Sequence, residues 1–144
     1  MTTTVQSPAT PEPADQAAPL TDKHIVPALV DGQYVFLECP TWCVIDHVRE
    51  NQKFLADVWH SGPFADLEAP RRADTPLLFA YARLGIDPFS SDDEMRRPFL
   101  FVEDGVSAEG SYMDAEHAEQ FADNLVAFAE KIRTMGRALK AEVA

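Results

Sequence analysis

The sequence predicts an α+β fold in which a small antiparallel sheet packs against a long C-terminal amphipathic helix. Short stretches rich in aromatic and branched residues occur before residue 105, and glycine, proline and aspartate bound them. Such stretches are typical of strands. From Ala118 to Leu139, apolar residues recur at three- and four-residue steps, which indicates a helix with one apolar face.

Three segments are the predicted strands. QYVFLE (33–38) follows the turn signal Asp31-Gly32, LLFAYARL occupies 77–84, and PFLFVE occupies 98–103. The polar connection between the last two is too short for a crossover helix, so antiparallel pairing is expected. The apolar segment 24–30 is interrupted by a proline, and both a linker and an edge strand are compatible with it.

The predicted C-terminal helix has a suitable residue at its start. Asp114 is a good N-cap, Glu116 and Glu119 lie near the positive end of the helix dipole, and basic residues lie toward its negative end. The apolar stripe needs a partner, and the inner face of the sheet is the expected one. We therefore interpret the stripe as part of the core.

The chain is expected to contain one folded domain. Residues 1–22 are rich in Thr, Pro, Ala and Gln and lack the apolar residues that would repay ordering, so they are predicted to be a disordered tail. Residues 23–144 are predicted to form a single α+β domain with a zinc-binding loop at 39–62. With 46% hydrophobic residues overall, this part of the chain should fold.

The charge and cysteine content restrict the partners and the compartment. The net charge of −12 repels phosphate backbones and anionic membranes, so nucleic acid is an unlikely partner. No apolar run is long enough to span a bilayer, and the N-terminus lacks the pattern of a signal peptide. We expect a cytoplasmic protein whose two cysteines are free to bind a metal. The oligomeric state cannot be read from the sequence.

The most specific motif is a C-x3-C-x3-H-x12-H arrangement formed by Cys39, Cys43, His47 and His60. Two thiolates and two imidazoles make a closed tetrahedral set that suits Zn²⁺. Both cysteines and two of the four histidines of the chain fall in this motif. For the other two histidines, His24 and His117, surface roles are expected.

Pro40 determines how these residues can meet. One continuous helix would separate the backbones of Cys39 and His47 by about 12 Å. Proline disfavours the α-region for the residue before it, so Cys39 is expected to end a strand. Cys43 and His47 would then follow on a turn or short helix, and His60 would return after a helical excursion.

Three neighbouring residues are candidates for supporting the site. Asp46 is expected to act from outside the ligand set by holding an imidazole N–H and so fixing its tautomer. Trp42 and Trp59 each precede a ligand and could shield the site from water. A solvated turn acid and plain core tryptophans are the alternative interpretation.

The sequence resembles a family of small, uncharacterised bacterial proteins and domains, common in actinomycetes and their phages. The family carries a CPxWC…DH…HxG signature. It appears here as Cys39-Pro40-Thr41-Trp42-Cys43, Asp46-His47 and His60-Ser61-Gly62. The resemblance covers residues 33–139 and supports the ligand set. Its members have no assigned activity, so the resemblance implies no reaction.

A zinc-stabilised binding or regulatory module acting through protein partners is the function we expect. A zinc-dependent hydrolase or deaminase is an alternative, but it needs an open coordination position, and neither the H-E-x-x-H nor the deaminase pattern is present. Thiol redox chemistry would more typically use C-x-x-C spacing. Zinc-finger binding to nucleic acid would place its long gap between the second cysteine and the first histidine.

Overall fold

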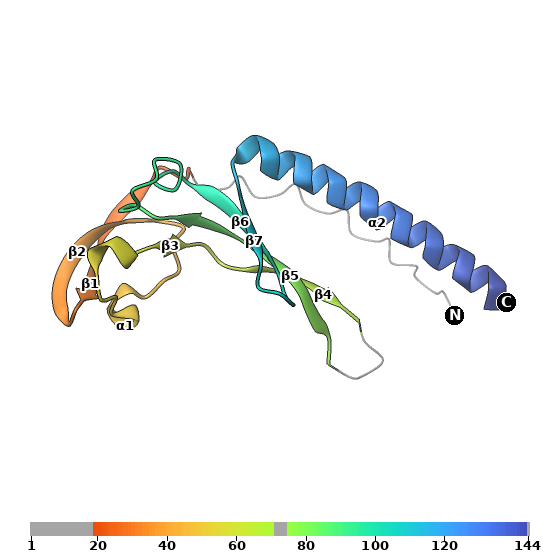
Figure 1. Cartoon of the computed structure of the whole chain (residues 1–144), viewed down its shortest axis with the longest axis horizontal. Helices are drawn as coiled ribbons and strands as arrows, with labels where there is room; N and C mark the ends of the chain where they lie inside the picture. Colours follow the sequence, from red (N-terminus) through yellow and green to blue (C-terminus); the bar gives the residue numbers. More distant parts are fainter. Residues whose placement is uncertain (1–18, 71–74, 144) are drawn as a thin grey trace, which may run out of the picture.

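The computed structural model describes residues 19–70 and 75–143, and its elements form two antiparallel sheets and one long helix (Figure 1). The first sheet is the hairpin of β1 (Lys23–Val30) and β2 (Gln33–Pro40). The second sheet contains β3, β4, β5, β6 and β7, and the helix α2 (Ala115–Val143) ends the described chain. The predicted α+β class is therefore confirmed.

The β1–β2 hairpin contains the strand predicted at 33–38, and it shows that the apolar segment 24–30 is a strand and not a linker. Residues 24–30 form most of β1 and pair with β2 along its whole length, from Lys23 opposite Pro40 to Val30 opposite Gln33. Pro27 is accommodated because β1 is an edge strand. Asp31 and Gly32 make the turn with positive φ, as the Asp-Gly signal predicts.

Alternation of side chains gives this hairpin an inner and an outer face. Ala28 and Leu37 are buried on the inner face together with Val58, and further valines of both strands pack against them. Cys39 continues the inner row of β2, two residues beyond Leu37, and is buried as well. The small core therefore leads directly to the first candidate ligand. The outer face carries exposed Tyr34 and Phe36.

The second sheet is built around β5 (Leu77–Ile86), which pairs with three other strands. On one edge, β3 (His60–Ser61) and β4 (Ala65–Ala69) pair with its two ends in turn. On the other edge it pairs with β6 (Phe99–Asp104), which pairs with β7 (Gly110–Met113). All of these pairs are antiparallel, as predicted. The strands predicted at 77–84 and 98–103 correspond to β5 and β6.

The sequence analysis did not predict β3, β4 and β7. These strands are short, and β4 and β7 consist mostly of exposed residues without an alternating apolar pattern. Their pairing is determined by the neighbouring strand, which their own sequences do not reveal. The helical excursion expected before His60 is reduced to α1 (His47–Glu50) and a single 3-10 turn, η1 (Leu55–Asp57).

The helix α2 begins where the sequence predicts but contacts the sheet over a short stretch. The Asp114 side chain accepts a hydrogen bond from the His117 backbone N–H at 2.9 Å, which caps the helix. Beyond its first turns the helix leaves the sheet, which it contacts at β6 and β7 (Figure 1). No residue of α2 is buried. The expectation that its whole apolar stripe lies in the core is therefore corrected, because the sheet is too short to cover it.

Two further predictions concern the N-terminal tail and the absence of a membrane-spanning segment. Residues 1–18 of the tail predicted at 1–22 lie outside the described residues, and the regular structure starts at Lys23. Among the described helices, none combines the length and the apolar character that a membrane span requires.

The turn between β6 and β7 packs closely against β5, and a glycine substitution can test this contact. A Cβ on Gly105 would overlap the backbone carbonyl oxygen of Leu78, whereas a Cβ on Gly136 of α2 would meet no atom within 4 Å. We expect Gly105→Ala to lower the free energy of unfolding by about 1–3 kcal/mol. Gly136→Ala should raise it by up to about 1 kcal/mol through helix propensity. Urea denaturation of both variants checks this, and equal midpoints would contradict the packing.

Candidate metal centre

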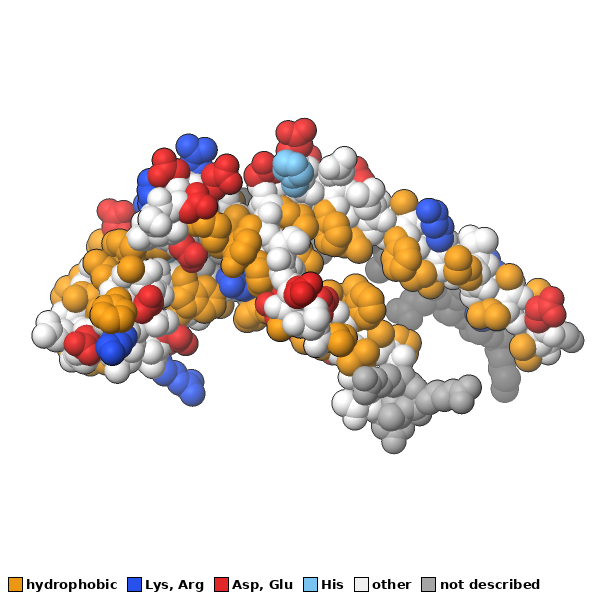
Figure 2. All heavy atoms as spheres, in the orientation of Figure 1, with side chains coloured by type: hydrophobic (Ala, Val, Ile, Leu, Met, Phe, Trp, Pro, Cys, Tyr) orange, Lys and Arg blue, Asp and Glu red, His pale blue; other side chains and the backbone are white. Residues whose placement is uncertain are grey.

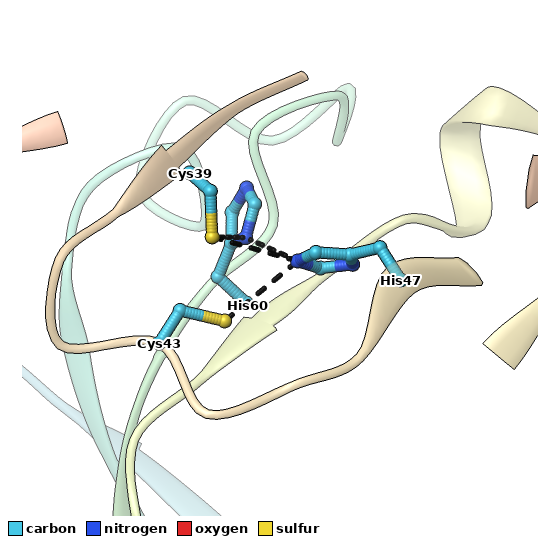
Figure 3. A group of neighbouring side chains, drawn as sticks. All are labelled: Cys39, Cys43, His47 and His60. Carbon is cyan, nitrogen blue, oxygen red and sulfur yellow. Dashed lines mark hydrogen bonds between the residues drawn. The ribbon is translucent and has the colours of Figure 1, made fainter. Parts of the chain in front are cut away.

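Four separate segments bring Cys39, Cys43, His47 and His60 together (Figure 3). Cys39 is the penultimate residue of β2, and the turn after this strand carries Cys43. His47 is the first residue of α1, and His60 opens β3. Cys39 thus comes from the end of a strand, as the effect of Pro40 predicts. Cys43 and His47 do not share a helix, since Cys43 lies before α1 begins.

The side chains point toward a common centre, and their donor atoms all lie within 4.8 Å of one another. Sγ of Cys39 is 3.6 Å from Nε2 of His47 and 3.5 Å from Nδ1 of His60. Sγ of Cys43 is 3.7 Å from Nε2 of His47, and the two ring nitrogens are 3.1 Å apart. This donor set could hold a metal ion.

Burial changes the proton affinity of these groups. Cys39 and His60 are each 2% exposed and His47 is 6% exposed, while Cys43 is partly buried. Burial, followed by the neighbouring Cys43, raises the pKa of the Cys39 thiol to about 12. Burial, followed by the nearby charges of His47 and Lys23, lowers the pKa of His60 to about 4. The imidazole of His60 is therefore neutral and ready to bind a cation, whereas the Cys39 thiolate needs one to be stable.

Asp46 supports the site through the backbone. Its side chain accepts hydrogen bonds from the backbone N–H groups of Val48 and Arg49, both at 3.1 Å, and so caps α1. No hydrogen bond joins Asp46 to His47 or His60 in the described part of the chain. The cap fixes the start of the helix that carries His47, a role different from the predicted bond to an imidazole N–H. Burial lowers the pKa of His47, and the charge of Asp46 partly opposes this.

Backbone hydrogen bonds hold the loop segments of the site against β3 and the second sheet. The Val44 N–H donates to the Ser61 carbonyl at 2.8 Å, and the Gly62 N–H donates to the Leu84 carbonyl at 3.0 Å. Trp42 lies close to Gly62, where an added Cβ would come within 3.7 Å of its ring. The indole N–H of Trp42 donates to the Leu20 carbonyl at 3.2 Å. Trp42 thus joins the site loop to the segment before β1.

Arg83 is a supporting residue that the sequence analysis missed. Its guanidinium carbon lies 4.5 Å from the ring centre of Trp59 and 4.9 Å from that of Phe101. Its Nη1 atom is buried and has no hydrogen-bond partner among the described residues. The guanidinium thus packs between the residue preceding His60 and the centre of the second sheet. A charged residue inside the apolar segment 77–84 was the available signal.

The remaining histidines stay outside the cluster. His24 is opposite Cys39 in the β1–β2 register, yet it is exposed and does not belong to the group of donor atoms. His117 lies near Asp114, which raises the pKa of His117 through a hydrogen bond.

A cavity of about 650 Å³ lies beside the start of α2, and none of the four candidate ligands lines it.

Comparisons with known proteins place these residues within one family. A family model described as a domain of unknown function matches residues 24–141, a range that includes the four candidate metal ligands. Neither the curated proteins nor the solved structures provide a match to the chain.

The protonated Cys39 thiol makes metal binding dependent on pH. Because the pKa of this thiol is about 12 without a metal and that of His60 is about 4, binding at neutral pH must release the proton of Cys39. The apparent metal affinity should therefore rise at least about tenfold per pH unit between about pH 6 and 8. Competition with a chromophoric chelator, corrected for its own protonation, measures this. An affinity independent of pH would contradict the expected thiolate ligand.

Proposed function

The chain belongs to the DUF6907 family, a domain of unknown function, and we propose that it is a zinc-structured binding module acting through protein partners. The observation that carries the proposal is the convergence of two thiols and two imidazoles from four segments. Such a set supplies four protein ligands to one ion, which is typical of structural zinc. Cys39, Cys43, His47 and His60 are the proposed ligands. A cytoplasmic location, where thiols stay reduced, is part of the proposal.

The spacing of the donor atoms supports zinc. Tetrahedral Zn²⁺, with bonds of about 2.3 Å to sulfur and about 2.05 Å to nitrogen, separates S and N by about 3.6 Å and the two nitrogens by about 3.3 Å. Three of the four S···N separations are 3.5, 3.6 and 3.7 Å, and the N···N separation is 3.1 Å. All donor atoms lie within 4.8 Å of one another, so the pair that is farthest apart would move closer on binding zinc.

The burial of the ligands favours a structural role over catalysis. A hydrolase or deaminase needs an open coordination position that water and substrate can reach. Here the side chains of Cys39, His47 and His60 are buried. Asp46, the carboxylate that directly precedes His47, already accepts two backbone hydrogen bonds in its capping role. Neither feature favours an activated water at the metal.

The outer face of the β1–β2 hairpin is the surface we propose for protein binding. Ile25, Tyr34 and Phe36 are exposed there, at 63%, 71% and 74%. Large exposed apolar and aromatic side chains that lie together mark interaction sites. Cys39 belongs to the same hairpin, so the metal would fix the end of the strand that carries Tyr34 and Phe36. The net charge of −12 favours a partner with a basic rim.

A matched pair of histidine variants tests the metal. His47→Gln should abolish retention of one zinc ion per chain and lower the free energy of unfolding by at least about 3 kcal/mol, because the bound ion stabilises only the folded state. His24→Gln makes the same change at an exposed position beside Cys39 and should leave both properties unchanged. Native mass spectrometry of protein purified without added metal, together with urea denaturation, measures them. Full zinc retention by His47→Gln would refute the ligand set.

The binding surface is tested with the zinc-loaded protein as bait. Proteins that bind the wild-type chain should be lost when Tyr34 and Phe36 are both changed to Ser, and they should dissociate as the salt concentration rises. Because both side chains are exposed, the variant should retain its zinc and its fold. Tyr112→Ser, at an exposed aromatic residue of β7, is the control. Equal recovery of partners by all three proteins would contradict the assignment of this face.

A further inference from the structure

The apolar side chains of α2 follow a heptad pattern. Ala118, Leu125, Ile132 and Leu139 are seven residues apart, and Phe121, Phe128 and Met135 fall between them at the complementary steps. This alternation of three and four residues is the pattern of a coiled-coil seam. From Phe121 to Leu139 the seam is about 27 Å long, at 1.5 Å per residue. The helix therefore carries a seam suited to a second helix.

Within residues 19–70 and 75–143, most of this seam has no partner. Phe121 lies beside the sheet, where it lines the cavity at the start of α2. Beyond it, Leu125, Phe128, Ile132, Met135 and Leu139 are 42–69% exposed. In Figure 2, hydrophobic side chains gather along one side of α2 where the helix diverges from the sheet. A stable single helix does not need such a seam, which points to an association.

The charges along α2 indicate the partner and its direction. The first half carries Glu116, Glu119 and Asp123 without a lysine or arginine. In the second half the four basic residues outnumber the two acidic ones, Glu130 and Glu142; the basic residues are Lys131, Arg133, Arg137 and Lys140. A second copy lying parallel would bring like charges together. An antiparallel copy brings the acidic half of each helix beside the basic half of the other. We propose that the chain forms a homodimer by antiparallel pairing of two α2 helices.

One register satisfies both the seam and the charges. Setting Phe121 level with the partner's Leu139 also sets Leu125 level with the partner's Met135, and Phe128 level with the partner's Ile132. On one flank of the seam the residues are small, namely Ala122, Ala129 and Gly136. Small side chains allow close approach of the helices, so Glu119 and the partner's Lys140, which both border this flank, come to the same level. Two-fold symmetry creates this pair twice.

The solution mass of the full zinc-loaded chain tests the dimer. Light scattering coupled to size exclusion should give twice the 16.0 kDa of one chain. Ile132→Glu places a charge in the seam and should yield a monomer. Ala127→Glu places the same charge on the opposite side of the helix and should leave the dimer intact. A monomeric wild-type chain at every soluble concentration would overturn the proposal, as would equal effects of the two variants.

Charge exchange tests the antiparallel direction. Glu119→Lys should weaken the dimer about three- to tenfold, because it creates two repulsive contacts with Lys140. Lys140→Glu should weaken it similarly, and the double variant should restore the wild-type dissociation constant. In a parallel dimer the flank that carries Glu119 would face the other flank of the partner, and the partner's Lys140 would lie about 30 Å away along the axis, so the double variant would not restore binding. Absence of rescue in the double variant, measured by sedimentation equilibrium, would therefore overturn the antiparallel arrangement.

Discussion

The convergence of Cys39, Cys43, His47 and His60 is the constraint on which the rest of the structure depends. The described part of the chain buries few apolar side chains, and its largest cluster is built around Ala28, Leu37 and Val58. Small cores often need a metal or another cross-link. The four side chains come from the β1–β2 hairpin, the turn after it, α1 and β3. A shared ion would connect the hairpin to the second sheet.

The surroundings of the cluster are arranged for a buried cation. Burial keeps the His60 imidazole neutral, the form that binds zinc, and makes a thiolate at Cys39 unfavourable unless a cation is bound. A divalent ion compensates the buried negative charge. The stability of the site and the protonation of its ligands are therefore coupled. This coupling suits an ion that is held permanently.

The two proposed surfaces lie on different elements and have different chemistry. The outer face of the β1–β2 hairpin presents Tyr34 and Phe36, close in sequence to Cys39. The helix α2 contacts the second sheet near its start and extends away from it (Figure 1), and the exposed part of the seam follows Phe121. A dimer formed through α2 would leave both hairpins free, and it would present two copies of the hairpin face to a partner. Two linked weak contacts bind more tightly than either one alone.

Local chemistry in the sequence determined a large part of this structure. The strands at 33–38, 77–84 and 98–103 were predictable because each has its own apolar pattern, and Asp114 marks the start of α2. The grouping of Cys39, Cys43, His47 and His60 was predictable because cysteine and histidine are rare in this chain and lie close together in the sequence. Pro40 even indicated that Cys39 belongs to a strand, since proline restricts the residue before it.

Only the tertiary structure decided which segments meet. The strands β3, β4 and β7 form because β5 and β6 offer them backbone partners, and their own short sequences carry no such information. The position of Arg83 between Trp59 and Phe101 depends on strand register. The exposure of the apolar stripe of α2 is also decided by the tertiary structure. Its sequence shows that the stripe needs a partner, but only the length of the sheet decided that most of the stripe stays exposed.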